Sequence, residues 1–178
     1  MKSQLGRPVV SALLTGCLCL GCAHLLDRRP VDRTGADDPL VVALLHKDYR
    51  AAVRMLQKGY PVAGRSTFAD APAFWAMARG DSEGLRLLIR FGLDVNHEWG
   101  KDGGNLLVNA VQFGNLELVQ VLCEAGASPL RDARYSRSPL YCAVVNGREA
   151  IERYLRGRGA KFNDWDLEAL RLSGQKPR

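Results

Sequence analysis

Apolar segments rich in leucine recur along the chain, and each of them ends two or three residues before a glycine. These glycines are Gly59, Gly92, Gly126 and Gly159, and they are separated by 33, 34 and 33 residues. A glycine placed directly after a helix favours a left-handed cap at the helix C-terminus. The pattern predicts four tandem copies of one helical unit about 33 residues long, and internal repetition of this kind is typical of a solenoid.

A second set of positions keeps the same step. Each unit has an alanine and, four residues before it, a proline or leucine: Pro39 and Ala43, Pro72 and Ala76, Leu106 and Ala110, Pro139 and Ala143. Proline suits the first position of a helix because its φ is already helical and it has no amide hydrogen to leave unpaired. Three units should therefore open with a sharply started first helix, and Leu106 should start its helix less sharply.

The two helices of each unit are expected to be joined by a turn. The dipeptides at this place are Lys47-Asp48, Gly80-Asp81, Gly114-Asn115 and Gly147-Arg148. The second helix then carries the leucines. The sequence thus predicts an all-α fold in which residues 39–163 form four helix-turn-helix units.

Two segments connect this pattern with a known family. Residues 138–143 (SPLYCA) and residues 114–127 (GNLELVQVLCEAGA) resemble the ankyrin repeat, in which Thr-Pro-Leu-His-x-Ala opens the first helix and Leu-Leu-x-x-Gly-Ala-x-Val-Asn closes the second. Asp94-Val95-Asn96 matches the end of that second motif. The resemblance covers about 125 residues and implies an ankyrin-repeat solenoid of four repeats.

The chain departs from the ankyrin pattern at two positions of every copy. The signature histidine is replaced by Val41, Phe74, Val108 and Tyr141, and the threonine before the proline is replaced by Asp38, Ala71, Asn105 and Ser138. In the family these residues make hydrogen bonds to the turns. Some of those bonds should be missing here, and the finger loops should be less regular than in consensus repeats.

A further helix is predicted after the repeats, in residues 164–178. Asp164–Leu172 is acidic at its start and apolar at Trp165, Ala169 and Leu172. Because the last repeat of a solenoid would otherwise expose its apolar side, this helix is expected to cover it. The residues from Ser173 to the end should fray.

The N-terminal residues 1–22 have the pattern of an export signal. Lys2 and Arg7 precede an apolar stretch from Val9 to Leu20, and charge returns only at Asp27. About a dozen apolar residues are too few for a permanent membrane span, so cleavage is expected. Residues 23–38 are rich in proline, glycine, arginine and aspartate after His24-Leu25-Leu26, which is typical of a flexible tether.

Two cysteines at the end of the apolar stretch resemble the lipobox of bacterial lipoproteins. Leu14-Thr15-Gly16-Cys17 matches the motif better, whereas Cys22 leaves an apolar stretch of more usual length and is slightly favoured. The resemblance implies that one of them becomes the lipidated first residue. No aspartate follows either cysteine, which in Gram-negative lipoproteins favours the outer membrane. A simple secretory signal and a buried apolar helix are the alternatives.

Charge and side-chain chemistry exclude several classes of function. The 25 basic and 19 acidic residues are spread without a long basic run, so no nucleic-acid partner is expected. His24, His46 and His97 lie in separate places, and the glycine-rich segment Lys101–Gly104 lacks the spacing of a phosphate-binding loop. We therefore expect no catalytic residue, metal, cofactor or small-molecule substrate. Cys123 and Cys142 are expected to be neighbours, either as buried thiols or, in an oxidising periplasm, as a disulfide.

The candidate binding residues follow from the family resemblance. Ankyrin proteins usually contact their partners through the finger tips and the exposed side of the first helices. The finger positions are Thr67, Phe68, Asp70, Lys101, Asp102, Gly104, Arg134, Tyr135 and Arg137, and the helix positions are Ala78, Arg79, Gln112, Phe113, Val145 and Asn146. Aromatic and arginine side chains often dominate interface energies. Local packing is the competing explanation for Phe68 and Phe113. Trp99, in the connection between Asn96 and Asn105, is a further candidate for binding, with local packing as an equal alternative.

The sequence therefore predicts a non-enzymatic protein-binding module of the bacterial envelope. It is expected in the periplasm, attached to the outer membrane by a lipid anchor only, with another protein as partner. An immunity protein or inhibitor for a periplasmic toxin or enzyme is the leading hypothesis. A scaffolding role, which supports an envelope assembly or a periplasmic enzyme, is the alternative.

Overall fold

The computed structural model describes residues 38–63, 71–97, 105–130 and 138–173 of the chain, and the helices in these ranges confirm the all-α prediction. The first helices of the four repeats are α1 (Pro39–Leu45), α3 (Pro72–Ala78), α5 (Leu106–Phe113) and α7 (Pro139–Val145). The second helices are α2 (Tyr49–Gln57), α4 (Ser82–Arg90), α6 (Leu116–Glu124) and α8 (Glu149–Gly157). Helix α9 (Asp164–Leu172) follows the last repeat. The described residues contain no strand. None of their helices has the length and hydrophobicity that crossing a bilayer requires.

Each first helix begins at the predicted residue. Side chains of Asp38, Asn105 and Ser138 accept hydrogen bonds from backbone N–H groups in the first turn of their helices, whereas Ala71 cannot do so. The expected loss of turn-side hydrogen bonds is therefore confirmed at Ala71. Leu106 starts its helix at the equivalent position despite lacking the proline ring, because Asn105 Oδ1 accepts from the Val108 N–H at 2.8 Å. A side-chain cap of this kind typically contributes about 1 kcal/mol.

The helix ends also follow the predicted pattern. The four glycines after the second helices have φ between 85° and 93°, the left-handed conformation that a C-cap requires. The turns between the two helices of a repeat contain Lys47, Gly80, Gly114 and Gly147, which also have positive φ. The finger loops lie outside the described residues, so their expected irregularity stays a prediction.

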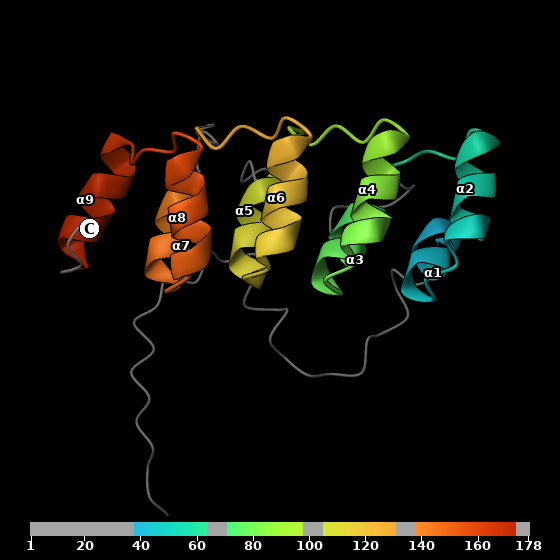
Figure 1. Ribbon diagram of the computed structural model, residues 1–178, viewed down its shortest axis with the longest axis horizontal. Helices are drawn as coiled ribbons and strands as arrows, with labels where there is room; N and C mark the ends of the chain where they lie inside the picture. The colour runs from blue at the N-terminus through green and yellow to red at the C-terminus, as the bar shows by residue number, and fades with distance from the viewer. Residues whose placement is uncertain (1–37, 64–70, 98–104, 131–137, 174–178) are drawn as a thin grey trace, which may run out of the picture.

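The repeats stack side by side and bury one continuous apolar core. Figure 1 shows the helix pairs in a row, from α1 and α2 at one end to α9 at the other. Neighbouring first helices contact one another, as do neighbouring second helices. The predicted alanines are buried and allow close approach, from Ala43 at 7% exposed to Ala110 and Ala143 at 0%. Leucines of both layers, such as Leu106 of α5, Leu88 of α4 and Leu122 of α6, fill the space between them with no exposure.

Helix α9 covers the last repeat, but with only one of the three predicted apolar side chains, Ala169. Ala169 and Leu170 are buried, whereas Trp165 is 82% and Leu172 is 76% exposed. The expectation that Trp165 and Leu172 belong to the packed face is therefore wrong. The buried positions centre on Asp166, whose Oδ1 accepts from the Ser138 N–H of the fourth repeat at 3.2 Å. This bond fixes the rotation of α9, and at 100° per residue Trp165 and Leu172 then point sideways.

A hydrogen bond between the first two repeats makes stability depend on pH. The Tyr49 hydroxyl donates to Asp81 Oδ1 at 2.7 Å. Burial raises the pKa of Tyr49 to about 12 from 10.0, and the hydrogen bond and the negative charges of Asp81 and Glu83 act in the same direction. The folded state therefore holds this proton more tightly than the unfolded state. The protonated phenol of Tyr49 therefore makes its full contribution to stability below pH 10, and this contribution is lost as the pH rises towards 12.

We expect the melting temperature of the wild type to fall more steeply between pH 10 and pH 12 than that of Tyr49→Phe, which has no proton to lose there. Below this window the variant should be less stable by about 1 kcal/mol, the usual value of one hydrogen bond. Thermal melts followed by circular dichroism at several pH values provide the comparison. Parallel curves for the two proteins would show that the Tyr49 phenol does not contribute.

Candidate protein-binding surface

The structure places the described candidate residues at equivalent sites on three adjacent first helices. Arg79 caps the C-terminus of α3, Phe113 ends α5, and Asn146 caps α7. Gln112 and Val145 are half-buried and precede Phe113 and Asn146 by one residue. Since α3 contacts α5 and α5 contacts α7, these side chains form one row, which we call the first-helix row. The predicted helix contribution to the surface is thus brought together.

Phe113 is the aromatic anchor of this row. Its ring stands edge-on to that of Phe74, with 5.8 Å between the ring centroids. Phe74 is only 3% exposed, whereas Phe113 keeps 37% of its surface exposed. One side of the ring therefore packs on the preceding repeat, as the local-packing explanation expects, while the other side faces solvent, and its role in binding stays a prediction. A ring held in this way loses little freedom on binding, which favours affinity.

Polar side chains flank the aromatic ring. Arg79 and Asn146 are both exposed, and Asn146 donates from Nδ2 to the Cys142 carbonyl at 2.7 Å. The row thus offers one aromatic surface, one cation and one amide. Such a mixture suits a protein surface better than a small apolar ligand.

The remaining candidate residues lie outside the described ranges. These are Thr67, Phe68, Asp70, Lys101, Asp102, Gly104, Arg134, Tyr135 and Arg137 of the fingers, together with Trp99 and the two lipobox-like cysteines Cys17 and Cys22. Their assignment to the surface or to lipidation stays a prediction.

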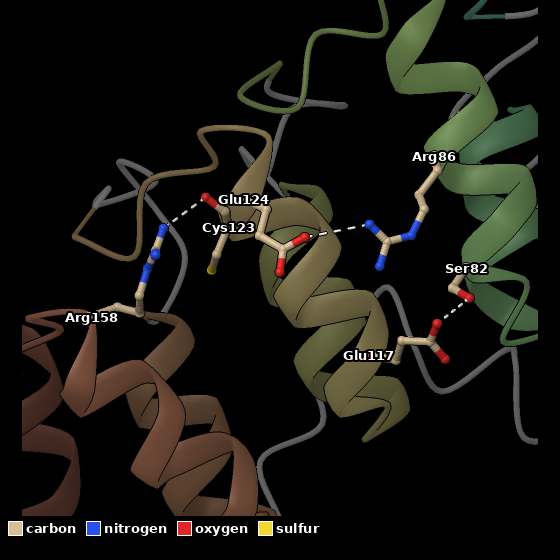
Figure 2. Close-up of polar contacts among 6 residues, drawn as sticks. All are labelled: Ser82, Arg86, Glu117, Cys123, Glu124 and Arg158. Atoms are coloured by element: carbon tan, nitrogen blue, oxygen red, sulfur yellow. Dashed lines mark hydrogen bonds and ion pairs between the residues drawn. The ribbon is translucent and has the colours of Figure 1, made fainter.

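A series of polar contacts holds the second helices, and hence the first-helix row, in register. Figure 2 shows the Ser82 hydroxyl donating to Glu117 at 2.6 Å and Arg86 reaching Glu124 at 3.4 Å, both between α4 and α6. Both partners of the ion pair are more than half exposed, so the pair itself adds at most about 1 kcal/mol. Its main effect is to fix how one repeat sits on the next.

Contacts to the backbone continue this series. Arg158 donates to the Cys123 carbonyl at 2.9 Å, which satisfies an acceptor at the C-terminal end of α6 (Figure 2). Asn96, which belongs to the Asp94-Val95-Asn96 motif, donates to the Gly126 carbonyl at 3.0 Å and accepts from the Ser128 N–H at 3.1 Å. One asparagine side chain therefore joins the second repeat to the third.

Cys123 and Cys142 are both buried, and no disulfide joins them in this structure. Burial raises the pKa of Cys123; Arg158 opposes this effect and Glu124 adds to it. A raised pKa keeps the sulfur protonated, and a protonated thiol is a poor nucleophile. The first of the two expected states, buried thiols, is the one observed.

Sequence reasoning missed several exposed apolar side chains. Val42 on α1 is 37% exposed, and Leu130, which follows the third repeat's second helix, is 58% exposed. The exposure of Val42, Trp165 and Leu172 depends on how their helices are rotated, and that of Leu130 depends on the turn after α6. No group of three metal-binding side chains occurs among the described residues.

The stacked helix pairs, the continuous core and the exposed first-helix row define the class of the protein as a helical-repeat solenoid of the kind that binds other proteins. The family model for ankyrin repeats (3 copies) matches residues 33–131 and 73–166. The chain therefore belongs to the ankyrin-repeat family. Ankyrin repeats are protein-interaction modules that typically carry no enzymatic activity, so this part of the chain is a protein-binding domain.

Two curated proteins share stretches of this sequence. The chain is similar to the E3 ubiquitin-protein ligase Ufd4 of Drosophila melanogaster, with 44% identity over 82 residues, and these cover 45% of this chain and 3% of Ufd4. It is also similar to the E3 ubiquitin-protein ligase XBAT33 of Arabidopsis thaliana, with 32% identity over 117 residues, which cover 64% of this chain and 23% of XBAT33. The chain thus spans less than a quarter of the length of these relatives, and the similarity is local.

Proposed function

We propose that this chain is an exported bacterial envelope protein whose ankyrin domain binds another protein in the periplasm through the first-helix row and the fingers. The observation that carries the proposal is the position of Phe113, half-exposed between exposed Arg79 and Asn146 on adjacent helices. Interface energy usually concentrates in such aromatic and arginine anchors. The charged and apolar pattern of residues 1–22 supports export.

Within this proposal, the partner is a toxin or enzyme that the domain inhibits. Binding over several repeats covers a large area, which suits occlusion of an active site. The proposal includes a lipid anchor at Cys22 or Cys17 that holds the domain at the outer membrane. The second candidate is a scaffold that supports an envelope assembly, a role that the same exposed surface also serves.

Affinity capture of the full chain from membranes, followed by mass spectrometry, tests the two parts of the proposal separately. The mass of the N-terminal peptide reports whether Cys22 or Cys17 carries lipid, and the co-purifying proteins give the partner. For inhibition, sub-micromolar affinity for a toxin and rescue of cells exposed to it are expected. Binding without rescue, together with an envelope defect on deletion, would favour the scaffold.

The double variant Phe113→Ala and Tyr135→Ala should weaken binding of the captured partner at least about tenfold, because each truncated anchor typically costs about 2 kcal/mol. Isothermal titration calorimetry measures the change, and a thermal melt shows whether the loss of the Phe113 contact with Phe74 has altered the fold. Leu172→Ala is the matched control, since it removes an exposed apolar side chain from α9. Equal affinity for the wild type and the double variant would move the site elsewhere.

A further inference from the structure

Helix α2 has one side that no repeat covers, and the contacts of α6 identify which side this is. Glu117 and Glu124 of α6 face the preceding repeat, since they bind Ser82 and Arg86 of α4. Arg50 occupies in α2 the position that Glu117 occupies in α6, two repeats later. It therefore points away from α4. Among the described residues no repeat precedes α2, which lies at the end of the row in Figure 1.

The same side carries two more basic residues. Arg54 occupies the position of Leu87 in α4 and Val121 in α6, which are only 8% and 2% exposed because the preceding repeat covers them. In α2 this position is exposed, and so is Lys58 one turn later. Residues spaced by four lie along one side of a helix. We call the three side chains Arg50, Arg54 and Lys58 the α2 basic face.

These positive charges are not compensated by neighbouring carboxylates. Three arginines of the other helices have acidic partners, in the pairs of Arg86 with Glu124, Arg156 with Glu152 and Arg171 with Glu168. The α2 segment contains no acidic residue, and within the described ranges no carboxylate forms an ion pair with the α2 basic face. The face therefore presents three positive charges to whatever lies beyond the end of the solenoid.

Helix stability favours Arg54 in the last turn of α2 and Lys58 at its C-cap, but it does not explain Arg50. Arg50 lies in the first turn of α2, where the helix dipole disfavours a cation. The equivalent residues of α4 and α6 are Glu83 and Glu117, which the dipole favours. The terminal repeat of a solenoid needs a polar outer side for solubility, but solubility does not require charges of one sign.

Apolar atoms lie beside the basic groups. Tyr49, Arg50, Val53 and Arg54 line a shallow open hollow on α2. Arginine can lay its aliphatic stem along such a surface and extend its guanidinium group to an anionic neighbour. Basic side chains that border an apolar strip are typical of helices that lie on a membrane surface.

We propose that the α2 basic face rests on a bilayer that contains anionic phospholipid. This inference rests on the envelope location in the proposed function. A chain from Cys22 to Asp38 can span at most about 55 Å, and Asp38 adjoins α1, at the same end of the solenoid as α2. Of all repeats, the first is therefore held closest to the membrane. Electrostatic attraction reaches only about 8 Å at physiological salt, so contact requires this proximity.

Binding of the full-length chain, made without lipid, to vesicles of phosphatidylcholine with and without phosphatidylglycerol tests the proposal. Each kind of vesicle gives one partition constant for the protein. Dividing the constant with phosphatidylglycerol by the constant without it isolates the electrostatic contribution to binding, because the apolar N-terminal stretch affects both constants equally. The triple variant Arg50→Gln, Arg54→Gln, Lys58→Gln should lower this ratio about tenfold or more. The matched control Arg86→Gln, Arg90→Gln, Arg153→Gln loses the same charge from other helices and should lower it far less.

Further measurements separate the alternatives. The ratio should fall in high salt for the wild type, and Arg50→Lys with Arg54→Lys should retain it, which also guards against misfolding as the cause. Equal ratios for the two triple variants would overturn the proposal. The proposal would also be overturned if the triple variant of the α2 basic face bound the captured protein partner more weakly but kept the wild-type vesicle ratio. The α2 basic face would then be a protein contact. Neither lipidation nor the partner of Phe113 enters the vesicle experiment, so its failure leaves the proposed function standing.

Discussion

Replacing Asp166 by alanine is expected to lower the free energy of unfolding by about 3 kcal/mol. The carboxylate is completely buried, and both of its oxygens accept hydrogen bonds from backbone N–H groups. Oδ1 accepts from Ser138 at 3.2 Å and Oδ2 accepts from Asn163 at 3.2 Å. Alanine would leave both donors without a partner, and an unsatisfied buried donor costs about 1 to 3 kcal/mol.

The loss has a second component, because α9 would be released from the fourth repeat. Asn163 Oδ1 accepts from the Asp166 N–H at 2.7 Å, which completes a reciprocal capping box at the start of α9. With half of this box removed, Leu170 would spend more time exposed. Urea denaturation followed by circular dichroism measures the total change. Asp164→Ala is the matched control, since Asp164 is an exposed acid in the same turn; similar losses for the two variants would contradict a special role for Asp166.

Replacing Gly84 by alanine is expected to destabilise the protein by about 2 kcal/mol, although the same change within a helix normally adds up to about 1 kcal/mol of stability. A Cβ at Gly84 would overlap Oδ2 of Asp81 and lie 2.9 Å from its Cγ and 3.2 Å from Cδ2 of Leu44. The Asp81 side chain cannot easily move aside, because Oδ1 accepts from the Tyr49 hydroxyl and the Gly84 N–H.

Gly157→Ala provides the comparison for this prediction. Gly157 is also a helical glycine, at the end of α8, and a Cβ there would meet nothing within 4 Å. We expect this variant to be as stable as the wild type or more stable. Thermal and urea unfolding of both variants measure whether the change in stability relative to the wild type has opposite signs at the two positions. If Gly84→Ala were also stabilising, Asp81 would have to be mobile rather than fixed by its hydrogen bonds.

The repeated part of the fold could be predicted from the sequence because its signals are local. Pro39, Pro72 and Pro139 determine where their helices start, and the glycines after the second helices adopt the left-handed conformation that their position requires. Such backbone preferences depend on one or two residues and do not change when repeats pack together. The all-α class and the ankyrin family followed from the constant spacing of these residues.

The rotation of α9 could not be predicted in the same way. Trp165 and Leu172 are the most apolar large side chains near its ends, yet the helix turns Asp166, Ala169 and Leu170 inward. The reason is the hydrogen bond from the Ser138 N–H, 28 residues earlier in the chain. A buried acid satisfied by distant backbone leaves no trace in the hydrophobic pattern of its own helix, so sequence reasoning placed the wrong face inward.

The candidate surface was predictable where it follows the repeat. Arg79, Phe113 and Asn146 are separated by the repeat length, and stacking brings such residues into one row. The support of Phe113 by Phe74 was not predictable, because the two rings belong to different repeats and their contact depends on how the first helices tilt. The charge of the α2 basic face was visible in the sequence, but only the contacts of α6 show that it faces outward.

The hydrogen bonds that join one repeat to the next, or the last repeat to α9, share a property that bears on how the chain folds. Their partners are separated by 28 to 38 residues, from Ser138 with Asp166 to Arg86 with Glu124. Contacts over so short a separation give a low contact order, which favours rapid folding. They also allow one end to open while the other stays folded. Under the proposed export, the chain therefore begins to fold at its first complete pair of repeats, before the rest has crossed the membrane.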